Sequence, residues 1–209
     1  MKTLKALLLL SPLVPAFCHT APPLMHTAPS IIENPYGSDL QQDLSRTDPN
    51  APEAHLARAV THGDLAKTKE LLDSGVNKDG LASGVTPLAL AAFYSYTPII
   101  DLLLEKGAHL NVDKEGLPPL TAAVSGRNPS ISLVQLFLDH GALPDAVDRD
   151  GQTALHKAAK RDLVDIIEIL IRAQANPSLK DAYSKTPFDY APAGSPLAQR
   201  LKNYQDSLL

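Results

Sequence analysis

The feature that most constrains this chain is a motif that recurs about every 33 residues. Motifs of the Thr-Pro-Leu type occur at spacings of 32, 35 and 33 residues, beginning at Thr86, Pro118, Thr153 and Thr186. A second series keeps step with the first, at Gly75-Val76, Gly107-Ala108, Gly141-Ala142 and Ala173-Gln174. Between the members of each pair lie two short apolar segments with helical periodicity. This arrangement predicts a stacked array of helical hairpins.

Residue chemistry assigns the helix starts. Thr86 is expected to cap the first helix of its unit, while Pro87 occupies the first turn, where a missing N–H costs nothing. Thr97-Pro98 and Asn128-Pro129 are expected to repeat this device at the starts of second helices. Two glycines are expected to end second helices in the left-handed conformation, namely Gly107 and Gly141.

The units differ in length. The regular unit spans 21 residues from Thr86 to Gly107. The unit from 118 to 141 carries two more residues near 127–130, and the unit from 153 to 173 is one residue shorter near Arg161. Both irregularities are predicted to fall in the turn between paired helices, where changes of length are tolerated.

At two stretches the chain resembles the ankyrin repeat. The stretch Asp148-Arg-Asp-Gly-Gln-Thr-Ala-Leu-His-Lys-Ala-Ala159 is similar to the family pattern Asp-x-x-Gly-x-Thr-Pro-Leu-His-x-Ala-Ala, with Ala154 in place of proline. Leu102-Leu-Leu-Glu-Lys-Gly-Ala108 is similar to the family's second helix and glycine exit. The resemblance covers residues 52–202 and implies an all-α ankyrin-repeat solenoid of about four to five helix-turn-helix units with short finger turns.

The terminal units depart from the pattern, as expected for repeats that have one neighbour instead of two. Residues 54–75 form a first unit without Thr-Pro, and the second helix of a closing unit at 179–202 is interrupted by Pro192 and Pro196. We therefore divide the chain into a signal peptide at 1–18, a proline-rich flexible leader at 19–51 and an ankyrin-repeat domain at 52–209.

The first residues have the pattern of an export signal. Lys2 and Lys5 precede an apolar run from Ala6 to Phe17, which is too short to span a bilayer. Cleavage is predicted after Ala16 or after Cys18, with the second site preferred. A lipid anchor at Cys18 is an alternative, disfavoured by the bulky residue before it. These features predict a periplasmic protein.

Composition excludes several classes of function. Cys18 is the only cysteine, so no intrachain disulfide is possible. The net charge is −4 for the whole chain and −6 without residues 1–18, and no basic stripe is present, so we expect no nucleic-acid partner. We also expect no membrane span and a monomeric protein when free.

The sequence offers little that is suited to catalysis. It contains no His-Glu-x-x-His, no paired cysteines, no Gly-x-Ser-x-Gly and no phosphate-binding glycine loop. His156 stands where the ankyrin family usually has a histidine that bonds the backbone of neighbouring loops. Asp148-x-Asp150-Gly151 resembles part of a calcium loop, but the ankyrin turn explains it better. We predict a protein that is not an enzyme and uses no cofactor or metal.

Three of the few aromatic residues fall together after an apolar run, at Phe93, Tyr94 and Tyr96. In the ankyrin family the two positions after Ala-Ala point towards the concave groove, which implies that Phe93 and Tyr94, with Tyr96 just beyond them in the turn, are partner-binding residues. Alternatively, Phe93 or Tyr96 packs between helices. The same mapping in the other units adds residues to the predicted groove: Lys114, Glu115, Leu117, Arg149, Asp150, Gln152, Lys160, Arg161, Tyr183 and Lys185.

Two kinds of function remain open. The chain resembles immunity proteins (antitoxins) that occlude a secreted antibacterial effector, including lipase or phospholipase effectors of type VI secretion. That resemblance implies one protein partner, a secreted toxin, with an acidic or polar surface. The alternative is an accessory partner that stabilises an exported enzyme such as a periplasmic catalase. An ankyrin effector acting in a host is a further alternative.

Overall fold

The computed structural model describes residues 48, 50–82, 84–112, 116–192 and 203. The chain divides into a unit of residues 1–34 and a unit of residues 35–209, and every described residue lies in the second unit. The predicted signal peptide, nearly all of the predicted leader and the second helix of the closing unit lie outside the described residues.

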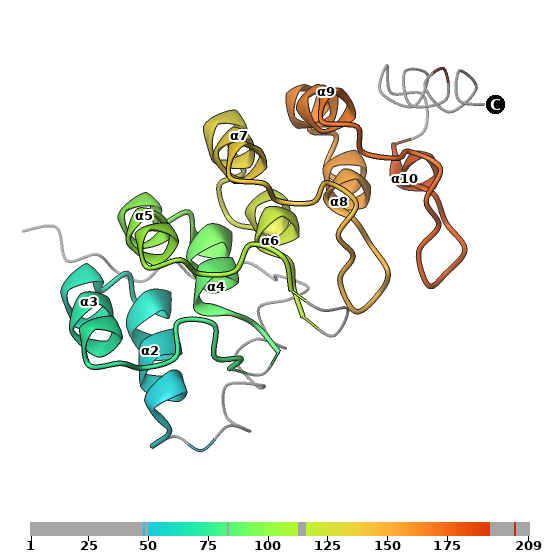
Figure 1. The fold of residues 1–209 in the computed structure, drawn as a ribbon. Helices are drawn as coiled ribbons and strands as arrows, with labels where there is room; N and C mark the ends of the chain where they lie inside the picture. Colours follow the sequence, from blue (N-terminus) through green and yellow to red (C-terminus); the bar gives the residue numbers. More distant parts are fainter. Residues whose placement is uncertain (1–47, 49, 83, 113–115, 193–202, 204–209) are drawn as a thin grey trace, which may run out of the picture. The chain divides into compact units, whose positions relative to one another are not determined.

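The described helices come in consecutive pairs. In chain order they are α2 (Pro52–Thr61) and α3 (Leu65–Asp73), α4 (Pro87–Tyr94) and α5 (Thr97–Glu105), α6 (Pro119–Ser125) and α7 (Ile131–Asp139), α8 (Ala154–Lys160) and α9 (Val164–Arg172), and then α10 (Pro187–Tyr190). The first members, α2, α4, α6, α8 and α10, pack side by side as an inner row. The second members, α3, α5, α7 and α9, form an outer row (Figure 1).

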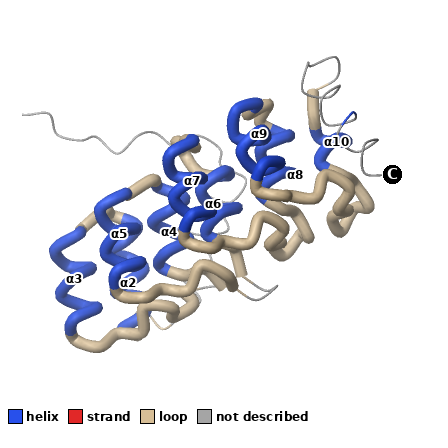
Figure 2. Tube along the Cα trace, turned by 45° about the horizontal axis from the view of Figure 1, so that its top comes forward, coloured by secondary structure: helices blue, strands red, loops and turns tan. Residues whose placement is uncertain are grey.

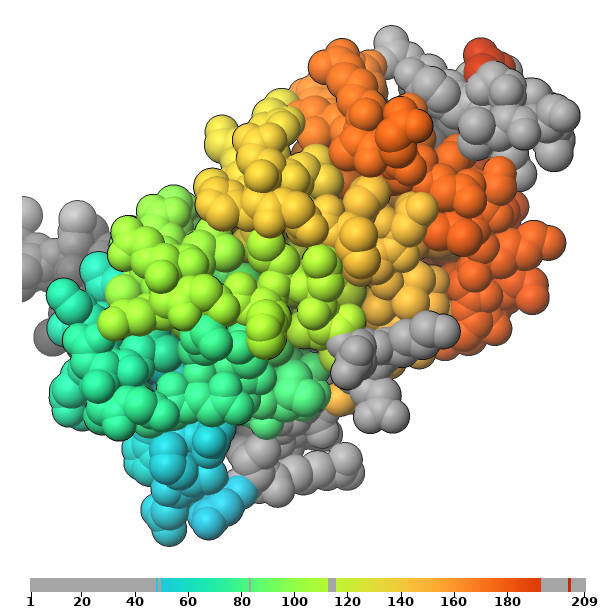
Figure 3. Space-filling view, viewed as in Figure 1, coloured from blue at the N-terminus to red at the C-terminus, as the bar shows by residue number. Residues whose placement is uncertain are grey.

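The described part of the chain consists of helices and loops (Figure 2). The units follow one another as successive bands from α2 to α10 in the space-filling view (Figure 3). The predicted all-α solenoid of helical hairpins is therefore confirmed.

The inner helices begin as the sequence predicts. The side chain of Thr86 accepts a hydrogen bond from the Ala89 N–H at 3.2 Å, and Pro87 is the first residue of α4. Thr153 caps α8 in the same way, and its partner His156 completes a reciprocal capping box. Such caps satisfy N–H groups that a helix start leaves free. The starts of α4 and α8 are thus fixed by residues of their own units, whereas α2 and α6 begin without a side-chain cap.

The outer helices begin differently from the prediction. Thr97 and Pro98 are already inside α5, whose N-cap is Tyr96 and makes no side-chain capping bond. Asn128 and Pro129 lie in the turn, and Ser130 caps α7 by accepting from the Leu133 N–H at 3.2 Å. The extra residues of this unit therefore occupy the turn, as predicted, but they displace the cap towards α7.

The end of α9 corrects the predicted register. Gly107 and Gly141 have φ values of +73° and +90°, as expected, whereas the left-handed residue after α9 is Gln174 with φ +66°. Gln174 donates to Ile171 O, the bond that Gly107 makes to Leu104 O. The exit position is therefore Gln174 rather than Ala173, and this unit has the regular length of 21 residues.

The core lies between the two rows. Alanine pairs on adjacent inner helices are fully buried, which allows the helix backbones to approach closely: Ala91 and Ala92, Ala122 and Ala123, and Ala158 and Ala159. Larger apolar side chains fill the space towards the outer row, among them Leu88, Ile100, Leu103 and Phe137. Close packing of this kind makes the stack a rigid support for residues on its surface.

Candidate partner-binding surface

The predicted binding residues lie at the two ends of the inner helices. We call the surface at the turns after these helices the turn strip, comprising Tyr94, Tyr96, Arg127, Lys160 and Arg161. The surface at the loops before them is the finger strip, comprising Arg149, Asp150, Tyr183 and Lys185. Helix α8 has seven residues and separates the two strips by about 10 Å in its unit. The predicted groove residues thus fall into two sets, one at each end of the inner helices.

Phe93 belongs to the core and not to the binding surface. Only 2% of its surface is exposed, although it stands at the position that the family pattern assigns to the groove. The backbone of Phe93 is also in close contact with the next unit. A Cβ built on Gly126 would lie 2.3 Å from the Phe93 carbonyl oxygen, so the glycine lets the turn after α6 pack directly on the end of α4. The prediction that Phe93 anchors a partner is therefore wrong.

Tyr94 and Tyr96 form a stacked pair that is partly exposed. Their ring centroids are 5.7 Å apart and their planes differ by 17°. The Tyr96 ring lies over Gly63 of the first unit, where an added Cβ would be 3.0 Å from the ring. Tyr94 also meets the buried Phe93 ring edge to face at 5.3 Å. The pair is therefore held from below by the core and from the side by the preceding unit.

Arg127 extends this stack into the third unit. Its guanidinium carbon lies 4.9 Å from the centroid of the Tyr94 ring, in a cation–π arrangement. Its backbone N–H donates to the Phe93 carbonyl at 3.0 Å, which fixes the base of the side chain. Burial raises the pKa of Tyr94, and the neighbouring Arg127 charge opposes that shift. The phenol therefore stays neutral near pH 7.

Sequence reasoning did not single out Arg127. The signal that could have found it is the period itself, because Arg127 follows Tyr94 by 33 residues and precedes Arg161 by 34. These three residues stand at equivalent turns of successive units. The two extra residues near 127–130 obscured this equivalence between the turns.

Arg161 has a structural contact within the stack. Its Nη1 donates to the carbonyls of Val124 at 2.6 Å and Gly126 at 2.8 Å, at the end of α6. A cation at this place satisfies free carbonyls and complements the negative end of the helix dipole. Arg161 remains partly exposed, and burial of the rest lowers its pKa. The turn strip thus runs through three successive units, from Tyr94 to Arg161, and its Tyr96 ring rests on Gly63 of the unit before them.

At the other end of the inner helices, two loops share one hydrogen-bond pattern. The Asp148 carboxylate accepts from the backbone N–H groups of Asp150 and Gln152, at 3.0 and 2.9 Å. Asp181 accepts from those of Tyr183 and Lys185 in the same way, at 2.9 and 3.0 Å. These bonds confirm that the Asp-x-x-Gly pattern marks a turn, because the carboxylates hold their own loops.

A buried polar network joins these loops to α8 and α10. The Lys157 ammonium lies 2.8 Å from Asp148 Oδ2 and 2.6 Å from Gln152 Oε1, and its side chain is 6% exposed. Gln152 Nε2 in turn donates to Asp181 at 2.9 Å, and the Tyr190 hydroxyl donates to the same carboxylate at 2.6 Å. Gln152 therefore belongs to the interior and not to a binding surface.

The charges of this network are set by burial and by hydrogen bonds. Burial raises the pKa of Asp148 to about 6 and lowers that of Lys157 to about 8, so both stay ionised at pH 7. Burial opposes ionisation of Asp181, but hydrogen bonds from Tyr190 and Gln152 outweigh it and lower the pKa to about 2. Burial and the bond to Asp181 raise the pKa of Tyr190 to about 12.

His156 has the structural role that the sequence predicts. Its Nε2 lies 3.1 Å from the Lys185 carbonyl of the next loop, and its Nδ1 lies 3.2 Å from the Thr153 backbone N. Burial lowers the pKa of the ring, so the imidazole is neutral near pH 7. A neutral ring can accept from Thr153 and donate to Lys185, which links one unit to the next.

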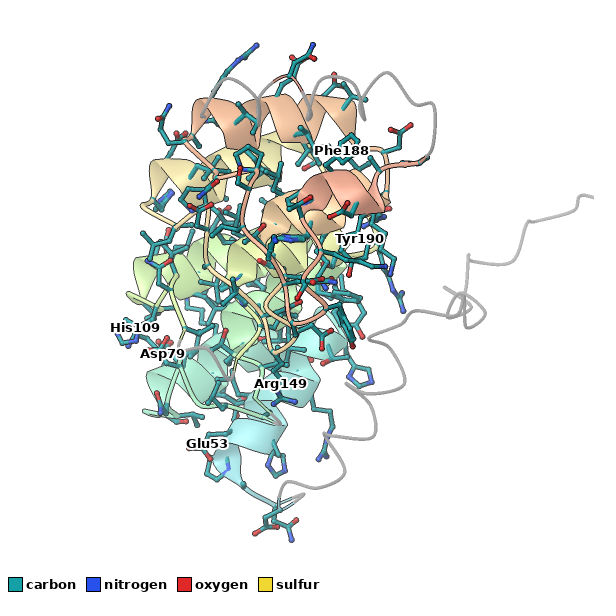
Figure 4. The ribbon with its side chains drawn as sticks, turned by 90° about the vertical axis from the view of Figure 1, so that its right-hand side faces the viewer. Glu53, Asp79, His109, Arg149, Phe188 and Tyr190 are labelled. Atoms are coloured by element: carbon teal, nitrogen blue, oxygen red, sulfur yellow. The ribbon has the colours of Figure 1, made fainter. Side chains whose placement is uncertain are left out.

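The exposed part of the finger strip consists of single side chains. Tyr183 is 66% exposed, and Arg149 and Lys185 are also exposed, with the Lys185 ammonium 5.2 Å from the Tyr190 ring centroid. Figure 4 shows Arg149 and Tyr190 in the same view, with Asp79 and His109 at another edge. The last two lie 3.2 Å apart between His109 Nδ1 and Asp79 Oδ2, with the His109 side chain exposed and the Asp79 side chain partly buried, and they form an ion pair when the histidine is charged.

The remaining predicted residues do not add to either strip. Leu117 is only 8% exposed and belongs to the core. Lys114 and Glu115 lie outside the described residues. Within the described ranges, no three histidine, cysteine or acidic side chains meet in a way that could hold a metal ion. None of the helices described here is both long and apolar enough to cross a bilayer.

Family models match most of the repeat region. A model described as "Ankyrin repeats (3 copies)" matches residues 36–114 and 55–131, and one described as "Ankyrin repeats (many copies)" matches residues 137–191. Together the matches extend over more than half of the chain. The chain is an ankyrin-repeat protein. Ankyrin repeats are protein-binding scaffolds, so at this level the function is protein binding.

The ankyrin-repeat protein is similar to parts of longer animal proteins. B-cell lymphoma 3 protein homolog of Mus musculus is 40% identical over 106 residues, which is 50% of this chain and 23% of that protein. Ankyrin repeat, SAM and basic leucine zipper domain-containing protein 1 of Mus musculus is 36% identical over 107 residues, 49% of this chain and 22% of that protein. Its counterpart in Ornithorhynchus anatinus is 32% identical over 120 residues, 56% of this chain and 25% of that protein. The chain thus spans about a quarter of the length of these relatives.

Proposed function

We propose that this ankyrin-repeat protein binds one protein partner through the turn strip. The observation that carries the proposal is the partly exposed Tyr94–Tyr96 stack, continued by Arg127 and held rigidly over the core. Tyrosine and arginine are the residue types that most often dominate binding energy at interfaces. Because neighbouring units already hold these side chains in place, binding costs little ordering of side chains.

We further propose that the protein is exported to the periplasm and that its partner is a secreted toxin, which it occludes as an immunity protein. Support for export comes from the basic and apolar pattern of residues 1–18. Support for occlusion comes from the extent of the turn strip, which crosses three units and could cover an active-site cleft of a lipase or phospholipase. The predicted absence of catalytic groups agrees with a role in binding alone.

The test is a quantitative comparison of two tyrosine variants. The protein that co-purifies most tightly with the full chain from its native cells serves as the ligand, and its affinity is measured for the wild type, Tyr94→Ala and Tyr183→Ala. Truncating an anchor costs about 2 kcal/mol or more, so Tyr94→Ala should weaken binding about thirtyfold. Tyr183→Ala makes the same change on the finger strip and should have little effect.

The outcomes separate the parts of the proposal. Full-strength binding by Tyr94→Ala, with a loss in Tyr183→Ala, would transfer the contact to the finger strip. If the captured protein is an enzyme, its activity should fall when the ankyrin-repeat protein is added. Unchanged activity with greater thermal stability of the enzyme would support the accessory role instead. The mass of the protein recovered from the periplasm tests export, because a retained Met1 would contradict cleavage.

A further inference from the structure

We propose that Arg127 and Arg161 form a carboxylate-binding site on the turn strip, occupied by an acidic segment of the protein partner. This inference rests on the proposed function, because it names the chemistry of the partner at the same surface. It adds Arg127, which was not among the predicted binding residues, and it gives Arg161 a second role beside its bonds to α6.

Arg127 presents its donors in a fixed orientation. The guanidinium is held over the Tyr94 ring, and that ring is stacked on Tyr96, which packs over Gly63. Among the described residues, no carboxylate or carbonyl bonds the Arg127 side chain. A guanidinium has five N–H donors in one plane, and stacking leaves those at its edges free for a carboxylate. Little side-chain freedom is then lost when an anion binds.

Arg161 supplies a second guanidinium beside the same turn. Its Nη1 bonds the Gly126 carbonyl at 2.8 Å, and the peptide of that carbonyl leads directly into Arg127. The Nη1 bonds hold the group in place, while its other nitrogens have no bond to the described residues. The two arginines therefore flank the Gly126–Arg127 peptide, and the exposed Lys160 adds a third positive charge. Two separate guanidiniums suit a segment with more than one carboxylate.

The surroundings favour an acidic protein segment over a nucleic acid. The net charge of the chain is −4, and Asp162 directly follows Arg161, so the long regular charge of a nucleic acid would meet repulsion beyond the two arginines, whereas a short acidic segment can end at them. The partly exposed rings of Tyr94 and Tyr96 lie beside the site and offer apolar contact to side chains next to the carboxylates. Carboxylates flanked by apolar groups match this combination, because arginine binds a carboxylate through two parallel hydrogen bonds.

The experiment uses three probes on the isotope-labelled full chain: hexaglutamate, hexaglutamine and a six-nucleotide oligothymidylate. Amide chemical shifts report where each probe binds. We expect hexaglutamate to shift the Gly126 and Arg127 amides in a saturable way and hexaglutamine to leave them unmoved. Arg127→Gln should weaken hexaglutamate binding about tenfold, as expected for loss of charge-assisted hydrogen bonds. Arg172→Gln is the matched control, since it removes the same charge from the outer helix α9.

Three results would overturn the site. Arg127→Gln could bind hexaglutamate as well as the wild type does, or hexaglutamine could produce the same shifts. Tighter binding of the oligothymidylate at the same amides would indicate a nucleic-acid surface instead. The captured partner separates this inference from the proposed function. A partner that is lost in Tyr94→Ala but retained in Arg127→Gln leaves the proposed function standing without the carboxylate site. Hexaglutamate binding without any protein partner leaves the site standing without the proposed function.

Discussion

The turn strip and the finger strip lie at opposite ends of the same inner helices, yet they use their polar groups differently. At the finger end, Asp148, Lys157 and Asp181 are buried and direct their hydrogen bonds inwards, to loop backbone and to one another. At the turn end, Arg127 and the tyrosine pair stand on the surface and contact one another mainly through ring faces.

This difference separates stability from binding along each helix. The finger network leaves few polar groups for a partner, because its carboxylates and amide already bond within the protein. The turn strip commits almost none of the Arg127 donors. The finger end therefore links consecutive units, and the turn end presents surface side chains whose positions are fixed by those units. Side-chain substitutions at the finger end should therefore lower the stability of the fold with little effect on binding. Side-chain substitutions at the turn end should weaken binding with little effect on stability.

The largest expected effect is that of Lys157→Met, compared with Arg127→Met. Lys157→Met leaves the Asp148 carboxylate buried without its cation, and breaking a buried pair from one side costs about 3 to 5 kcal/mol. Arg127→Met removes an exposed cation and should cost less than about 1 kcal/mol. Urea unfolding of both variants measures the difference.

A double variant checks the cause of that loss. Adding Asp148→Asn to Lys157→Met removes the buried charge, so part of the lost stability should return. Equal urea midpoints for Lys157→Met and Arg127→Met would contradict the contrast between the two ends. No recovery in the double variant would mean that the unpaired charge of Asp148 is not the cause of the loss, which would then lie in the other bond of Lys157, to Gln152.

A smaller effect is expected from Gly126→Ala, which tests whether the turn strip depends on backbone packing. The added Cβ would lie 2.3 Å from the Phe93 carbonyl oxygen and would force the α6 turn away from α4. Overpacking of this kind costs about 1 to 3 kcal/mol. Thermal unfolding measures the cost, with Ser125→Ala as the control, since that change removes only a hydroxyl bonded to Thr121 O. A melting temperature equal to that of the control would show that the turn adapts.

The fold was predictable because its signals are local. A threonine cap, a proline in the first turn and a glycine exit each act within a few residues, so the helix pairs follow from the sequence. Asp148 and His156 were also placed correctly, because their partners belong to the same repeated loop pattern. The left-handed residue after α9, Gln174, was missed because glutamine, unlike glycine, is not a residue type that indicates a left-handed backbone.

The candidate site was only partly predictable, because its residues depend on the neighbouring unit. The backbone of Phe93 is in close contact with Gly126 of the next unit, and no residue near Phe93 in the sequence indicates that contact. Arg127 reaches the Tyr94 ring because the longer turn of its unit folds back on α4. To predict a contact of this kind between two units, the turns of both units must be aligned with each other. The irregular lengths of the units obscured that alignment.

The smallest expected effect is the coupling between Tyr94 and Arg127, measured by a double-mutant cycle of Tyr94→Leu and Arg127→Met. An exposed cation–π pair contributes about 0.5 to 1 kcal/mol, so the double variant should lose that much less stability than the sum of the single variants. The finger end has a similar pair, Lys185 and Tyr190, but the Tyr190 hydroxyl also bonds Asp181, so Tyr190→Leu would disturb the buried network as well. The Tyr94 hydroxyl makes no hydrogen bond to the described residues, and the contacts of the Tyr94 ring with Phe93 and Tyr96, lost in both variants that carry Tyr94→Leu, cancel in the cycle. Strict additivity would mean that Arg127 is not held by the ring, and its preorganisation for a carboxylate would lose its physical basis.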